Sequence, residues 1–212
     1  MKAMAQYLIS KGLEVTALYD DSATETAVFR SVTGANIFIY SGHGTTMGDG
    51  GKPGGLVLAK DYFLSSSDIR TKFHLATNAI VLFQSVCMAA GSSAGDEKDI
   101  GVQLAESRVS DYCKPFIDAG AAVYYATNTV GGGLSFLRDL WEGFSVKKIF
   151  ESQIDFTSKK ETIHPWAIRS GFELGLSSNI FNGTSTVITY ENRSEEHTSE
   201  LQSRVDISYA VF

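Results

Sequence analysis

Short apolar runs alternate with amphipathic stretches along the first 150 residues, and this alternation predicts the fold. The runs at 35–40, 79–86 and 121–127 are almost entirely apolar, which is typical of strands buried on both faces of a parallel sheet. Stretches with apolar residues at helical spacing lie between and after them. Three of these stretches are 24–32, 100–118 and 134–151. A fourth is a helix that begins at Asp68, with Ser67 as its candidate cap. The order predicts an α/β domain in which helices flank a mainly parallel sheet with right-handed crossovers.

The beginning of the chain departs from this pattern. Residues 1–11 have helical spacing and Gly12 follows where a helix would end, after which 13–19 alternate as a strand. A domain of this class normally opens with a strand, so we expect its first strand to be missing and Met1 to be internal. The remaining signals are a small hairpin at 56–58 and 62–64, a turn at His164-Pro165-Trp166, and weak, unplaced strand signals at 172–190.

Composition narrows the classes of function. The chain has 212 residues, of which 43% are hydrophobic, enough for one core and too many for a disordered chain. Its net charge of −6, with Lys and Arg scattered, argues against a nucleic-acid partner. No apolar stretch is long enough for a membrane span, and the first twenty residues lack a secretory layout, which leaves the cytoplasm as the default compartment. Cys87 and Cys113 are interpreted as free thiols.

The C-terminal segment is interpreted as foreign to the domain. Residues 193–203 resemble the in-frame translation of a common sequencing-adapter oligonucleotide, and 207–212 resemble the translation of its next part. Two matches in the right order are very unlikely by chance. We therefore take 193–212 as an artefactual tail that lies on the surface and contributes nothing to the core. Residues 1–192 are then a single domain, which we expect to be truncated at both ends.

Two short motifs have candidate chemistry, and each follows a predicted buried strand. Ser-Gly-His-Gly at 41–44 follows the strand at 35–40, and Ser-Val-Cys at 85–87 follows the strand core at 79–83. Chemistry in parallel sheets gathers at the carboxyl ends of the strands, and neighbouring strands lie ~4.8 Å apart. His43 and Cys87 would then share one crevice as general base and nucleophile. The N–H groups of Gly44 and Cys87 could stabilise an oxyanion.

A purely structural explanation stays open at this point. A cysteine after an apolar strand is usually a core residue, and a lone histidine is usually only hydrogen-bonded. Spacing alone does not decide between that explanation and a catalytic pair. The possible ligands His43, Asp49, Cys87 and Asp96 show no zinc-type spacing, so neither a metal nor another cofactor is expected.

The order of these motifs resembles the caspase-like cysteine peptidases, the clan that contains caspases, metacaspases, gingipains, clostripain, separase and bacterial CHAT domains. The resemblance runs from about residue 35 to 128, includes Gly-Gly-Leu-Val-Leu at 54–58, and is greatest to CHAT-type sequences. It implies a caspase-like three-layer sandwich in which His43 is the general base, Cys87 the nucleophile and Gly44 part of the oxyanion hole. The loop at 87–93 lacks the Gln-Ala-Cys and Asp-Ser-Cys forms, which leaves the subfamily open.

The resemblance also implies a reaction and a partner. We expect a cysteine endopeptidase that forms a thioester acyl-enzyme on Cys87 and releases it with water. Family members that cleave after Arg or Lys hold that cation with a carboxylate; Asp96 closely follows the cysteine loop, and no arginine adjoins either loop. The expected partner is thus a polypeptide with Arg or Lys before the scissile bond, contacted by Asp96. The alternatives are a CHAT-like signalling or binding module with little proteolysis, and a hydrolase- or flavodoxin-like domain in which Cys87 is structural.

Overall fold

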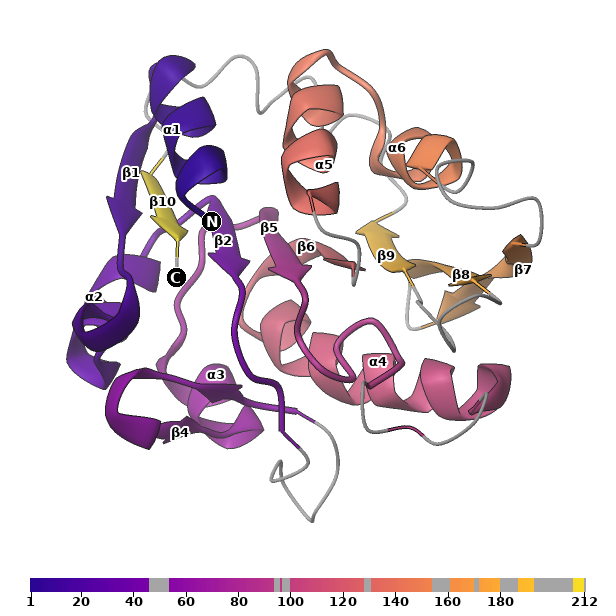
Figure 1. Cartoon of the computed structure of the whole chain (residues 1–212), viewed down its shortest axis with the longest axis horizontal. Coiled ribbons are helices and arrows are strands. Elements are labelled where there is room, and N and C mark those ends of the chain that lie inside the picture. Colours follow the sequence, from indigo (N-terminus) through magenta and orange to yellow (C-terminus); the bar gives the residue numbers. More distant parts are fainter. Residues whose placement is uncertain are drawn as a thin grey trace.

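The structure is a computed structural model, in which the chain forms a sheet with helices on both faces (Figure 1). The structure describes residues 1–45, 54–93, 96, 100–127, 131–153, 161–169, 172–179, 187–192 and 208–211. The strands of the sheet are β1 (Glu14–Ala17), β2 (Ile37–Tyr40), β5 (Ala79–Gln84), β6 (Ala121–Thr127), β7 (Glu161–Arg169), β8 (Phe172–Asn179), β9 (Val187–Asn192) and β10 (Ser208–Val211). Within these ranges the strand order is β1-β10-β2-β5-β6-β9-β8-β7.

Parallel pairing dominates the half of the sheet that contains the predicted strands. Strands β2, β5 and β6 pair in parallel, and β1 and β10 extend this parallel part. The predicted α/β class with parallel strands is therefore confirmed. The weak strand signals at 172–190 correspond to β8 and β9, whereas β7 was not predicted; the three strands extend the sheet beyond β6 with antiparallel pairing.

The helices cover the two faces of the sheet in two groups. They are α1 (Lys2–Ser10), α2 (Glu25–Val32), α3 (Ser66–Lys72), α4 (Gly101–Asp118), α5 (Gly132–Trp141) and α6 (Val146–Gln153). Helices α2, α3 and α4 pack in one core cluster, and α1, α5 and α6 pack in the other (Figure 1). Residues of β2 alternate between the clusters: Phe38 belongs to the first, and Ile37 and Ile39 to the second. All residues of β2 are buried, which explains its uninterrupted apolar run.

Local predictions hold for most elements and fail at two sites. The hairpin is present as β3 (Leu56–Val57) and β4 (Phe63–Leu64). The cap of α3 is Ser65 rather than Ser67, because the Ser65 hydroxyl accepts from the Asp68 N–H while the Asp68 carboxylate accepts from the Ser65 N–H. The turn predicted at His164-Pro165-Trp166 is wrong: these residues lie within β7, where the register with β8 shifts between His164 and Ala167. Such an irregularity tolerates a proline inside a strand.

The prediction that the C-terminal segment takes no part in the folded domain is wrong for Ser208–Val211. These residues form β10, which pairs in parallel with β1 on one side and with β2 on the other. Tyr209 and Val211 favour extended backbone, and strands β1 and β2 offer hydrogen-bonding groups on both sides of the position. Residues 193–207 and 212 lie outside the described residues. The foreign origin of the segment and the missing first strand stay predictions.

Candidate active site

The loops that follow β2 and β5 leave the sheet at the same edge. The two strands are adjacent and parallel, as predicted, and Tyr40 pairs with Phe83 in register. His43 lies three residues beyond Tyr40, and Cys87 lies four residues beyond Phe83. The carboxyl ends of neighbouring strands therefore bring the histidine loop (residues 41–45) and the cysteine loop (residues 85–93) to one place.

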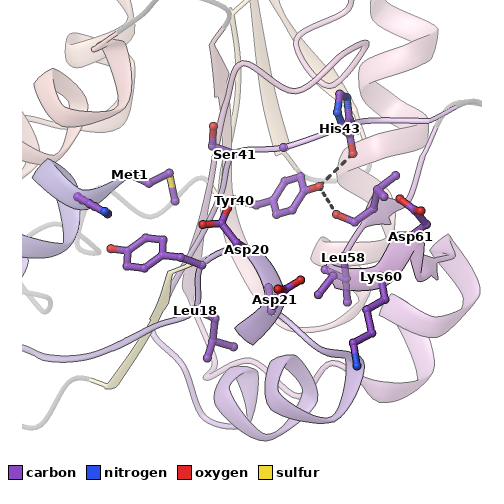
Figure 2. A pocket seen from close by; sticks show the side chains of 16 residues that line it. Met1, Leu18, Asp20, Asp21, Tyr40, Ser41, His43, Leu58, Lys60 and Asp61 are labelled. Carbon is purple, nitrogen blue, oxygen red and sulfur yellow. Dashed lines mark hydrogen bonds between the residues drawn. The ribbon is translucent and has the colours of Figure 1, made fainter.

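The histidine loop folds back along the segment that leads into β3. The Val57 N–H donates to the His43 carbonyl at 3.3 Å, and the Gly54 N–H donates to the Thr45 carbonyl at 3.0 Å. Gly44 forms an antiparallel bridge with Leu56 between these bonds. The His43 side chain is exposed, and Figure 2 shows its ring pointing away from the Tyr40 hydroxyl, toward which its carbonyl points. The backbone of this loop is thus fixed while the ring stays accessible.

The cysteine loop is a tight turn with strained backbone on both sides of Cys87. Ser85 has φ 57° and Met88 has φ 65°, a left-handed conformation that costs non-glycine residues roughly 1–2 kcal/mol. Hydrogen bonds from Met88 N–H to Ser92 and from Gly91 N–H to Met88 close the turn. Such strain clusters at functional sites. Cys87 is partly exposed, whereas Cys113, on α4, is a core residue.

Gly44 packs directly against the cysteine loop. A Cβ atom at this position would overlap the Cys87 carbonyl oxygen and would lie 2.5 Å from the Tyr112 hydroxyl, so no residue with a side chain fits without displacement. Neither the Gly44 nor the Cys87 N–H donates a backbone hydrogen bond to another described residue. In the described structure no hydrogen bond joins the His43 ring to the Cys87 thiol.

Asp96, which the sequence predicts to bind a substrate cation, is paired with a cation of the chain itself, while its contact with a substrate stays a prediction. The Arg108 guanidinium donates to its two oxygens at 2.7 and 2.9 Å, and the Ser93 N–H donates to it at 2.7 Å. Arg108, on α4, also donates to the Gly91 carbonyl at 3.1 Å. The prediction that no arginine adjoins the cysteine loop is therefore wrong, because helix α4 folds Arg108 back onto it. The hydrogen bonds from Arg108 hold the pKa of Asp96 below its ordinary value.

A pocket of about 620 Å³ lies beside the histidine loop (Figure 2). His43 is in its wall, but Cys87 is not, so this pocket is not the shared crevice that the sequence predicts. Its lining comes from separate segments: Met1, Lys2, Leu18–Asp21, Ala23, Tyr40–His43 and Val57–Asp61. The sequence gives no local signal for such a pocket, because its walls meet only in the folded chain.

Comparisons with known proteins add no assignment. In the described part of the chain, no group of three or more His, Cys, Asp or Glu side chains could hold a metal ion, and no helix is long and apolar enough to cross a membrane. No protein-family model matches the chain, and neither a curated protein nor a solved structure matches it significantly. Its function is therefore inferred from its own residues.

Proposed function

We propose that this chain is a caspase-like cysteine endopeptidase domain, of the three-layer sandwich type and closest in character to CHAT domains. One observation supports this most strongly. The loops bearing His43 and Cys87 leave adjacent parallel strands at one edge, and Gly44 packs on the Cys87 backbone. The strained turn around Cys87 and its partial exposure favour a functional thiol over the structural cysteine of a hydrolase- or flavodoxin-like domain.

The proposed reaction uses the histidine as base and the cysteine as nucleophile. His43 takes the thiol proton, the Cys87 sulfur attacks the peptide carbonyl, and the Gly44 and Cys87 N–H groups stabilise the resulting oxyanion. His43 then gives its proton to the leaving amine, which leaves a thioester. Water, deprotonated by His43, hydrolyses the thioester and restores the thiol. The proposal requires the exposed His43 ring to turn toward the thiol when substrate binds, and catalytic hydrogen bonds often tighten only at that stage.

The proposed substrate is a polypeptide. This class of substrate follows from the proposed cysteine and histidine chemistry; Gly42 and Gly44 themselves let the loop pack closely against Tyr40, Cys87 and Tyr112. A preference for Arg or Lys before the scissile bond has lost the contact on which it was predicted, because Asp96 is already paired with Arg108. Preference is therefore best measured without a prior choice, on peptides that end in Arg, Lys, Asp or Asn before a coumarin leaving group.

Cys87→Ala and His43→Ala test the proposal on this peptide panel. We expect Cys87→Ala to lower kcat/KM by at least about 10³-fold, and His43→Ala by about 10²-fold or more, because each removes one half of the reacting pair. Cys113→Ala is the matched control, since it removes the core thiol, and it should retain activity. An acyloxymethyl ketone should label Cys87 and spare Cys113. Peptide turnover that survives Cys87→Ala would refute the assignment.

A CHAT-like signalling or binding module is the second candidate. The observation that favours it is the absence, among the described residues, of a hydrogen bond between the His43 ring and the Cys87 thiol. Such a module would fold and bind without cleaving any peptide of the panel. Folded wild-type protein that shows no turnover and no ketone labelling of Cys87 would favour this candidate over the peptidase.

A further inference from the structure

Two buried tyrosines lie beneath the histidine loop, and the proposed reaction does not use them. Tyr40 is the last residue of β2 and is 3% exposed, and Tyr112 lies on α4 and is 1% exposed. Nothing in the spacing of the sequence marks either residue, because aromatic side chains at such positions ordinarily fill a core. Their hydroxyl groups nevertheless reach backbone atoms on both sides of Gly44.

Tyr40 binds the carbonyl of the proposed base itself. Its hydroxyl lies 3.0 Å from the His43 carbonyl and 2.8 Å from the Val57 carbonyl, and donates toward both (Figure 2). Burial raises the pKa of Tyr40 to about 12, so the hydroxyl keeps its proton throughout the neutral range. This contact ties His43 to the end of β2 and to β3 at the same time.

Tyr112 binds the other end of the loop from the helix side. The Thr45 N–H donates to the Tyr112 hydroxyl at 2.7 Å, and the hydroxyl lies 3.3 Å from the Thr45 carbonyl. Burial raises the pKa of Tyr112, with smaller contributions from the neighbouring Tyr40 and Cys87 side chains. The hydroxyl also lies 2.5 Å from where a Cβ of Gly44 would be. The Tyr112 hydroxyl and the Cys87 carbonyl thus both lie against Gly44.

We propose that Tyr40 and Tyr112 are positioning residues that hold His43 at the distance from Cys87 that proton transfer requires; this rests on the proposed function. The His43 ring makes no hydrogen bond to a described residue, so the backbone at 43–45 sets where it can reach. The two hydroxyl groups bind that backbone at both ends. Without them the loop can shift, and a displacement of about 1 Å lowers a rate about 10²-fold.

Tyr40→Phe, Tyr112→Phe and the double variant test the inference, with Tyr125→Phe as control. Tyr125 is equally buried but belongs to the core cluster on the opposite face of the sheet. We expect each of the first two variants to lower kcat by about 10- to 100-fold with KM within about twofold of the wild type. For the control Tyr125→Phe, kcat and KM should each stay within about twofold of the wild type, even if its melting temperature falls as much as those of the two loop variants.

A second measurement separates positioning from a loss of stability. Iodoacetamide alkylation of Cys87 is followed by mass spectrometry between pH 5 and 9 on folded protein, because a nearby imidazolium raises the thiolate fraction at low pH. The pH profiles of Tyr40→Phe and Tyr112→Phe should move toward that of His43→Ala, and Tyr125→Phe should match the wild type. Wild-type kcat and an unchanged alkylation profile in both loop variants would overturn the positioning role. Turnover that survives Cys87→Ala would instead overturn the proposed function, so the two failures are distinguishable.

Discussion

Among single residues, Asp96 and Arg108 show how the cysteine loop keeps its shape. Their side chains are each only 15% exposed and form a two-point ion pair. The Asp96 carboxylate accepts a hydrogen bond from the Ser93 N–H, and Arg108 donates one to the Gly91 carbonyl, so the ion pair is hydrogen-bonded to the loop at two places. The pair therefore supports the turn that presents Cys87.

Asp96→Asn should destabilise the protein by about 1–3 kcal/mol at pH 7. The substitution replaces the negative carboxylate that accepts hydrogen bonds from the largely buried Arg108 guanidinium with a neutral amide. The folded-state pKa of Asp96 is lowered, so its contribution is complete above the unfolded pKa of about 4 and is lost as pH falls through the folded pKa. Urea unfolding from pH 7 to pH 2 measures this. The difference between wild type and variant should be constant above about pH 5 and shrink below pH 4.

Asp118→Asn is the control for this prediction. Asp118 pairs with Lys114 at 3.8 Å, and their side chains are 39% and 73% exposed, so this pair should contribute at most about 1 kcal/mol. If Asp96→Asn is as mild as Asp118→Asn, the two-point pair does not support the loop. If it also changes the ratio of Arg to Asp peptides cleaved, Asp96 contacts substrate after all.

Among the elements, β10 changes the expected role of the C-terminal segment. Ser208–Val211 lies between β1 and β2 and pairs with both, so the two strands depend on it for their connection within the sheet. Helix α2, which belongs to the same core cluster as α3 and α4, also packs near β10 (Figure 1). A segment in this position contributes to stability whatever its origin.

Truncation after Asn192 should therefore lower the melting temperature by at least about 5 °C, since it leaves backbone groups of β1 and β2 unpaired. Ala210→Pro should also lower the melting temperature, because proline removes an N–H from a strand that is paired on both sides. Thermal unfolding followed by circular dichroism measures both. An unchanged melting temperature in both variants would restore the original expectation of a tail without a structural role.

At the scale of the whole molecule, Phe116 joins four elements of the first core cluster. Its ring lies 5.6 Å from Phe38 on β2, 5.2 Å from Phe83 on β5 and 6.4 Å from Tyr124 on β6. It lies 5.8 Å from Phe73, which follows α3. Helix α4, which also presents Arg108 and Tyr112 to the two loops, is thereby anchored on the sheet.

Phe116→Leu should destabilise the protein by about 1–3 kcal/mol, since it loses buried volume and several aromatic contacts. Phe144→Leu is the matched control at a position 38% exposed, and it should change stability by less than about 0.5 kcal/mol. Urea denaturation with a common m-value measures both. Equal effects of the two substitutions would show that Phe116 does not anchor α4.

Local sequence patterns were sufficient to predict the α/β class, the parallel pairing of β2 with β5, and the sheet edge at which the His43 and Cys87 loops lie. These follow from local patterns: fully buried parallel strands are continuously apolar, and their carboxyl ends share one edge. The helical stretch predicted at 134–151 is divided into α5 and α6 in the structure, and Gly143, with a φ of 86°, lies between them.

Which side chains surround the two loops depends on contacts between segments far apart in the sequence. Arg108 reaches Asp96, and Tyr112 reaches Thr45, only because the aromatic core fixes α4 against the sheet. The position of β10 between β1 and β2 is also a tertiary result, because the pattern of a four-residue strand does not select its neighbours in a sheet. Hydrophobic periodicity records which face of an element is buried, but it does not record which distant residue lies against that face.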